Sequence, residues 1–203
     1  MNQRIILASK SPARKAILGK LGLPFEVIVS DFVEDMTLPL SASELALYLS
    51  RGKASSLAKQ YPNAVVIAAD TFVVFQGAFL GKPKDEDDAR KMLTGLAGNT
   101  HTILTGLTVV QAGKTVSEVI FTEVKMKNVD ESKISEYVAS GEPLGKAGSY
   151  AIQGKGKELV EKIEGDYFNI MGLPLKTIAQ ILIKDFSIPV NFVYSDTDQG
   201  ALI

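Results

Sequence analysis

The chain has 203 residues, of which 46% are hydrophobic and 22% charged, and its net charge is −1. This composition is typical of a globular protein with a sizeable core, and the near-neutral charge excludes the basic excess of a protein that coats nucleic acid. The chain contains no cysteine and one histidine, which excludes disulfides, thiolate chemistry and metal sites built from several imidazoles. The side chains that remain for a functional site are carboxylates, hydroxyls, lysine and arginine.

The termini and hydropathy bear on the cellular location. The apolar segment at the N-terminus is too short for a signal peptide, and no stretch approaches the ~20 apolar residues that span a bilayer. We therefore expect a cytoplasmic protein with no membrane partner.

Strands and helices are predicted to alternate along the chain. In chain order, the first half is expected to contain a buried strand at 4–9, a helix opened by Ser11-Pro12 and ended by Gly22, a strand at 25–30, a helix at 43–58 and an apolar strand at 64–69 that ends on Asp70. The second half is expected to contain a hairpin at 72–80 turning at Gln76-Gly77, a helix at 85–96, strands at 101–110 and 115–127, a helix at 131–140, a strand at 159–163 and a helix opened by Leu173-Pro174.

This interleaving predicts an α/β fold with a mixed β-sheet flanked by helices. No repeat or linker divides the chain, so we expect one domain over residues 1–203. The tail at 187–203 has no clear period, and it is expected either to add a strand or to stay mobile.

A candidate anion site lies where the first strand meets the first helix. The free N–H groups and positive dipole end of a helix N-terminus attract phosphate, and Ser9, Ser11 and Arg14 would add direct contacts. The alternative is an N-cap serine beside a solvated basic face. The segment is not a P-loop, because G-x-x-x-x-G-K-[ST] is absent.

Two carboxylates are candidates for metal and water chemistry. Asp70 follows the most apolar strand, and ligands of open α/β sheets bind at the carboxyl ends of strands. Asp70 would bind a divalent metal or activate water, or alternatively would cap the next turn. Glu34 lies on an acidic loop that would otherwise be merely solvated.

Further candidates are Lys53, in the helix before the Asp70 strand, and Lys82, in the turn Gly81-Lys82-Pro83. Taken singly, both are more typical of surface lysines. Gln153 lies among glycines that would let a flat ligand approach the backbone or would simply make turns.

Taken together, these segments resemble the Maf family of nucleotide pyrophosphatases. The resemblance runs from about Ile5 to Leu182 and rests on ordered motifs: LASKSPAR at 7–14, ADT at 69–71, LGKP at 80–83, MLTGLAGNTH at 92–101, GEPLGKAG at 141–148, YAIQG at 150–154, and IEGDYFN at 163–169 with GLP at 172–174.

The resemblance implies an inosine-triphosphatase-like fold, with a curved sheet and two lobes around a cleft, in a homodimer. It implies hydrolysis of nucleoside triphosphates to monophosphate and pyrophosphate, with Mg²⁺ or Mn²⁺. By position, Asp70 would be the proton acceptor and would also touch the metal, and Glu34 would help to hold the metal. The phosphate-binding residues would be Ser9, Arg14, Lys53 and Lys82.

Base preference depends on fewer positions. Thr71 and Gln153 resemble the subgroup that acts on dTTP and UTP, and a glutamine amide suits the imide edge of a pyrimidine because it both donates and accepts. Ala13 departs from the arginine usual at a position linked to base selection, and Gly52 departs from the usual glutamate before Lys53.

Three alternative functions stay open: a non-catalytic regulator of cell division, a pyrophosphatase for inosine-type purine triphosphates, and a pyrophosphatase for 7-methyl-GTP.

Overall fold

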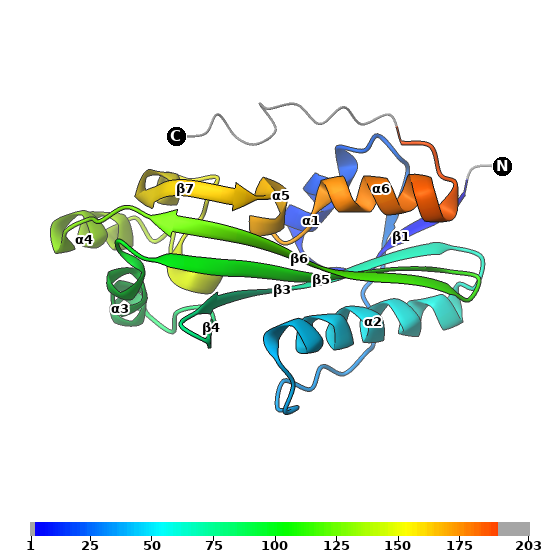
Figure 1. The fold of residues 1–203 in the computed structure, drawn as a ribbon, viewed down its shortest axis with the longest axis horizontal. Helices are drawn as coiled ribbons and strands as arrows, with labels where there is room; N and C mark the ends of the chain where they lie inside the picture. The colour runs from blue at the N-terminus through cyan, green and yellow to red at the C-terminus, as the bar shows by residue number, and fades with distance from the viewer. Residues whose placement is uncertain (1–2, 191–203) are drawn as a thin grey trace. The chain divides into compact units, whose positions relative to one another are not determined.

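The computed structural model describes residues 3–190. It has the predicted α/β fold, with a seven-stranded sheet flanked by helices (Figure 1). The strands are β1 (Ile5–Leu7), β2 (Glu26–Val27), β3 (Val65–Phe75), β4 (Ala78–Leu80), β5 (Thr100–Gln111), β6 (Lys114–Met126) and β7 (Val160–Gly165). The α-helices are α1 (Pro12–Gly19), α2 (Ala42–Gln60), α3 (Glu86–Leu96), α4 (Glu131–Ala139), α5 (Tyr167–Ile170) and α6 (Leu175–Phe186), and two short 3₁₀ helices span Ala147–Ser149 and Lys155–Leu159.

The sheet is mixed, as predicted. Its strand order is β2-β1-β3-β5-β6-β7, with β4 paired to β3. β1 pairs in parallel with both β2 and β3, whereas β4 and β7 pair antiparallel with β3 and β6. Contacts divide the chain into two compact units. Among the described residues, the first comprises 3–71, 104–120 and 166–190, and the second comprises 72–103 and 121–165.

The core of the first unit follows the alternation of side chains along β1 and β3. Ile5, Leu7, Val65, Ile67 and Ala69 pack with side chains of α1 and α6. The intervening residues Ile6, Ala8, Val66 and Ala68 pack with Ala54 and Leu57 of α2. In Figure 1, α1 and α6 accordingly lie on one face of these strands and α2 on the other. Because both faces are covered, the two strands are continuously apolar.

The predicted end of the strand at Asp70 is wrong, because β3 continues to Phe75. The residues that follow are Thr, Phe, Val, Val and Phe, which favour extended structure, and they pair with β4. The predicted hairpin is confirmed: Gln76 and Gly77 have φ of 50° and 79°, the positive values that a tight two-residue turn needs.

Two further differences are local. The strand expected at 25–30 is reduced to Glu26–Val27, and the four-residue helix α5 was not predicted.

The tail that was expected to begin at Ser187 is described as far as residue 190, and its Ile188 and Val190 pack against the core of the first unit. Residues 191–203 lie outside the described residues, so the predicted tail is not tested there. Within the described part of the chain, no helix is both long and apolar enough to cross a membrane.

Candidate active site

Asp70 lies on the face of β3 that is covered by α2. The alternation that places Val66 and Ala68 against α2 also places Asp70 there, just beyond the point where the parallel pairing of β1 with β3 ends at Leu7 and Ile67. The Asp70 side chain is 15% exposed. Its Oδ1 atom accepts the Thr71 N–H at 3.0 Å, and its Oδ2 atom accepts from Lys53 Nζ at 2.9 Å.

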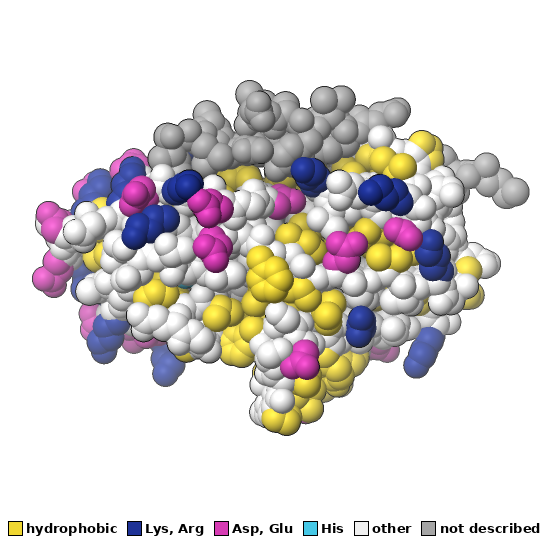
Figure 2. Space-filling model, in the orientation of Figure 1, with side chains coloured by type: hydrophobic (Ala, Val, Ile, Leu, Met, Phe, Trp, Pro, Cys, Tyr) yellow, Lys and Arg dark blue, Asp and Glu magenta, His cyan; other side chains and the backbone are white. Residues whose placement is uncertain are grey.

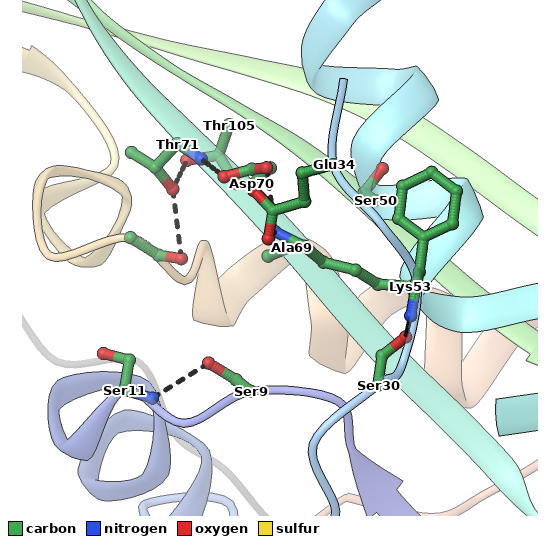
Figure 3. A network of polar contacts seen from close by, with 12 residues as sticks. Ser9, Ser11, Ser30, Glu34, Ser50, Lys53, Ala69, Asp70, Thr71 and Thr105 are labelled. Carbon is green, nitrogen blue, oxygen red and sulfur yellow. Dashed lines mark hydrogen bonds and ion pairs between the residues drawn. The ribbon is translucent and has the colours of Figure 1, made fainter. Parts of the chain in front are cut away.

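Lys53 joins two carboxylates that are distant in sequence. It lies in α2, whose N-terminus is fixed by a capping box between Ser41 and Glu44. Its Nζ atom is 2.9 Å from Asp70 Oδ2 and 3.1 Å from Glu34 Oε1. Glu34 reaches the site from the loop between β2 and α2, and its side chain is 47% exposed. Figure 3 shows Glu34, Lys53 and Asp70 together. The structure therefore brings together three of the predicted site residues.

Thr71 lies on the opposite face of β3, toward α1. Its hydroxyl contacts Arg14 Nη2 at 3.1 Å, Thr105 Oγ1 at 2.9 Å and the Gly172 carbonyl at 3.3 Å. Arg14 also donates from Nε to Gly172 O and from Nη1 to Ala69 O, both at 2.8 Å. Burial lowers the pKa of Arg14, although Asp70 and Glu34 act to raise it. The arginine predicted to bind phosphate thus also ties α1 to β3 and to the loop at Gly172.

The predicted N-cap at the start of α1 is confirmed. Ser11 Oγ accepts the Arg14 N–H at 3.3 Å, and Pro12 is the first helical residue. Ser9 is buried at the end of the β1 segment, where its Oγ accepts the Ser11 N–H at 3.2 Å (Figure 3). Ala13 is exposed in the first turn of α1. The two serine hydroxyls, the helix N-terminus and Arg14 form a polar segment in the same unit as Asp70.

Lys82 and Gln153 belong to the second unit and are both exposed. Lys82 follows β4 in a turn whose Gly81 carbonyl accepts the Gly148 N–H at 3.1 Å. No hydrogen bond or ion pair joins its ammonium to another described residue, so the group is available to a ligand. Basic and acidic side chains are interspersed on the face that Figure 2 shows.

Sequence reasoning missed two residues that hold the segment around Gln153. Tyr137 Oη accepts the Ala151 N–H at 3.1 Å, before Gln153. The Glu142 carboxylate accepts the N–H groups of Lys155 and Gly156 at 3.1 and 2.9 Å, after Gln153. The Tyr137 hydroxyl also hydrogen-bonds Glu142. The available signal was the glutamate in the motif GEPLGKAG, which precedes Gly156, whose N–H it accepts, by 14 residues.

Among residues 3–190, no group of three or more His, Asp or Glu side chains is gathered as a ready-made metal cage. Glu34 and Asp70 nevertheless present carboxylate oxygens on either side of one cation, the Lys53 ammonium. Mg²⁺ is typically bound by one or two carboxylates together with water and substrate phosphates. The donor set fits that kind of site.

Comparison with known proteins shows the family of this chain. The family model described as "Maf-like protein" matches residues 4–185, and the chain belongs to the Maf family. It is 47% identical over 188 residues to a protein of Thermoanaerobacter sp. (strain X514) named dTTP/UTP pyrophosphatase, covering 91% of this chain and 98% of the relative. A Bacillus cereus (strain AH820) protein of the same name is 44% identical over 189 residues, covering 93% and 98%. Among solved structures, a HAM1 protein from Coxiella burnetii is similar with a TM-score of 0.43 and 17% sequence identity. The similarity covers 63% of this chain and 74% of that protein, and it is too distant to bear on function.

Proposed function

We propose that this protein is a hydrolase that cleaves dTTP and UTP to the nucleoside monophosphate and pyrophosphate. The observation that carries the proposal is the grouping of Asp70, Lys53 and Glu34 on one face of β3, in the same unit as the candidate anion site at the start of α1. The names of the relatives that share 44–47% of their residues with this chain support the same activity.

In the proposed reaction, water attacks the α-phosphorus and the bond to the oxygen bridging the α- and β-phosphates breaks. Asp70 accepts the proton of that water, and pyrophosphate leaves with the electron pair of the broken bond. Ser9, Arg14, Lys53 and Lys82 hold the phosphates. Such a reaction depends chiefly on positioning and on neutralising charge, which cationic and N–H groups supply. Arg14 already donates three of its five N–H groups to the protein, so phosphate would meet the remainder.

The proposed cofactor is Mg²⁺ or Mn²⁺, held by Glu34 and Asp70. When bound, such an ion neutralises phosphate charge and polarises the phosphoryl oxygens. The two carboxylates share the Lys53 ammonium, which keeps them close to each other. Lys53 thereby prepares a pair of oxygen ligands and remains able to turn toward phosphate.

Base selection is proposed to involve Gln153, Thr71 and Ala13. Gln153 is exposed on a segment whose backbone is held on both sides, so its amide is presented from a fixed place. The Thr71 hydroxyl already contacts Arg14, Thr105 and Gly172, so its influence on the base would act through Arg14. The short Ala13 side chain leaves room at the start of α1.

A pyrophosphate-release screen across the nucleoside triphosphates tests the proposal. The expected result is turnover of dTTP and UTP well above that of GTP, ITP and 7-methyl-GTP. Release of orthophosphate with a diphosphate product would place the attack at the wrong phosphorus and overturn the mechanism. Tight nucleotide binding without turnover would favour a regulatory role, and preferred hydrolysis of a purine would overturn the base assignment.

The proposal also includes a cytoplasmic location, a single functional domain and a homodimer. The single domain is supported by the course of the chain, since β3, β5 and β6 each contribute residues to both compact units. Sedimentation of the whole protein with and without nucleotide tests the homodimer, and a mass of one chain under both conditions would contradict it.

A further inference from the structure

The loop that carries Glu34 is attached along one stripe of α2. Asp31 accepts a hydrogen bond from Ser56, and the Phe32 ring makes an edge contact with the ring of Tyr48, with centroids 5.7 Å apart. The Phe32 ring also covers Gly52. Positions 48, 52 and 56 are four residues apart, so they lie on the same face of the helix. The loop therefore follows a single helical stripe before it reaches Lys53.

Gly52 is what allows the ring to lie so close. A Cβ atom at position 52 would be 2.3 Å from Phe32 Cζ and 2.4 Å from Cε2, well inside van der Waals contact. The contacting atoms are the far end of a side chain, so a larger residue at 52 would displace the ring and leave the helix intact. Glycine is unfavourable inside a helix, and α2 runs unbroken through it from Ala42 to Gln60. The close approach of Phe32 gives this glycine a structural purpose.

Glu34 needs such an anchor, because little else holds it. The Glu34 side chain is 47% exposed, so water weakens its ion pair with Lys53 as a restraint on the loop. Val33 and Met36 are 84% and 51% exposed, so neither fixes the loop by burial. Figure 2 shows hydrophobic side chains at the projection where Figure 1 draws this loop. Phe32, two residues before Glu34, is the half-buried aromatic that attaches the loop to the helix.

We propose that Phe32, seated on Gly52, is a positioning residue that holds the Glu34 carboxylate beside Lys53 and Asp70. The Phe32 ring does not touch those three side chains in the contacts described above; it acts through the backbone of residues 32–34. The inference rests on the proposed function, since it gives Glu34 its purpose in binding the metal and the triphosphate.

The test compares Gly52→Ala, Phe32→Ala and the double variant with Gly95→Ala as the matched control. Gly95 is also helical, in α3, but a Cβ there would lie 3.9 Å from Phe75, an ordinary contact. Gly52→Ala is expected to keep or raise the melting temperature, because alanine favours the helix, and to lower kcat about tenfold or more, because misplacement of a reacting group is costly. Phe32→Ala is expected to give a similar loss, and the double variant no greater loss than Phe32→Ala alone. Gly95→Ala is expected to retain normal kcat.

Two readouts do not depend on turnover. Hydrogen exchange at the amides of residues 33–36 is expected to be faster in Gly52→Ala and Phe32→Ala than in the wild type and Gly95→Ala. Mn²⁺ binding in the presence of an α,β-methylene analogue of dTTP, followed by electron paramagnetic resonance, is expected to weaken in the same two variants. Wild-type kcat, exchange and Mn²⁺ affinity in Gly52→Ala would overturn the positioning role. Absence of pyrophosphate release in the wild type would instead overturn the proposed function, while the exchange measurement would still report on the anchor.

Discussion

Lys53 Nζ lies 2.9 Å from Oδ2 of Asp70, and both side chains are largely buried. The pair joins the second helix to the central strand of the first unit, and Glu34 contacts the same ammonium at 3.1 Å. One cation therefore offsets the repulsion between two carboxylates that would otherwise face each other and an incoming triphosphate.

Asp70→Asn is expected to fold normally and to lose about 10²–10⁴-fold in kcat, since loss of a general base typically has that effect. The amide keeps the shape of the carboxylate but does not accept the proton of water. The Thr71 N–H would retain an acceptor in the amide oxygen. Pyrophosphate release measures the rate, and thermal unfolding serves as the control for folding. A folded variant with near-normal turnover would move the role of base to Glu34.

Lys82→Ala is expected to impair turnover without affecting stability. The Lys82 side chain is exposed and belongs to a turn held by backbone contacts, including Gly81 O with Gly148 N–H. Measurements of kcat/KM and of the melting temperature, each on the variant and the wild type, distinguish a role in turnover from a structural role. A fall in melting temperature with normal activity per folded molecule would make the lysine structural.

Removal of divalent cations is expected to abolish pyrophosphate release and to leave the fold intact. Lys53 contacts both Glu34 and Asp70 and offsets part of their mutual repulsion, so the fold is not expected to need the metal. The measurement is activity in excess chelator, with circular dichroism as the folding control and added Mg²⁺ or Mn²⁺ as rescue. Full activity in chelator would contradict the metal proposal.

Gly106→Ala is expected to destabilise the protein by about 1–3 kcal/mol or more, the range typical of overpacking. A Cβ at this position of β5 would lie 2.3 Å from the carbonyl carbon and oxygen of Ala46 in α2. These are backbone atoms, which do not swing aside as a side chain does. Urea unfolding measures the loss, and Gly19→Ala is the control because nothing lies within 4 Å of its added Cβ. Equal stability of the two variants would show that α2 can shift.

Stability is expected to fall on acidification because of His101. Burial lowers the pKa of His101 from 6.5 to about 4; its Nε2 atom contacts Tyr150 Oη at 2.9 Å, and its Nδ1 atom has no partner among the described residues. The unfolded chain binds the proton near pH 6.5, whereas the folded chain binds it only near pH 4. The stability that the neutral His101 contributes is therefore complete above pH 6.5. As the pH falls toward 4, the free energy of unfolding decreases by roughly 3 kcal/mol in total.

Urea unfolding at pH 7 and at pH 4.5 measures this change in the free energy of unfolding. His101→Gln is the comparison, because a glutamine does not titrate in this range. The wild type is expected to lose more stability between the two pH values than the variant does. Equal losses would assign the acid sensitivity to other groups.

The sequence predicted best what depends on local signals. Ser11-Pro12 and Asp85 mark helix starts by capping, and both starts are confirmed. The hairpin at 72–80 was predicted, but the end of the preceding strand was misjudged, because the polar residues Asp70 and Thr71 interrupt the apolar run although the backbone continues as one strand into the hairpin. At the site, the position of Asp70 could be predicted from the strand that carries it. The contact of Glu34 with Lys53 could not, because Glu34 lies on an irregular loop whose sequence has no hydrophobic period. The role of Gly52 was equally hidden, because only the folded chain brings Phe32 onto it.

The support of Gln153 has an evolutionary consequence. Its segment is held by Tyr137 and Glu142 of its own unit, whereas Asp70, Lys53 and Glu34 are held by contacts within the other unit. Mutations that reshape residues 151–156 are therefore expected to leave the ion pairs of Lys53 with Asp70 and Glu34 in place. Under the proposed function, substitutions at Gln153 and its neighbours are open to selection for another nucleobase while the contacts of Asp70 with Lys53 and of Lys53 with Glu34 are retained.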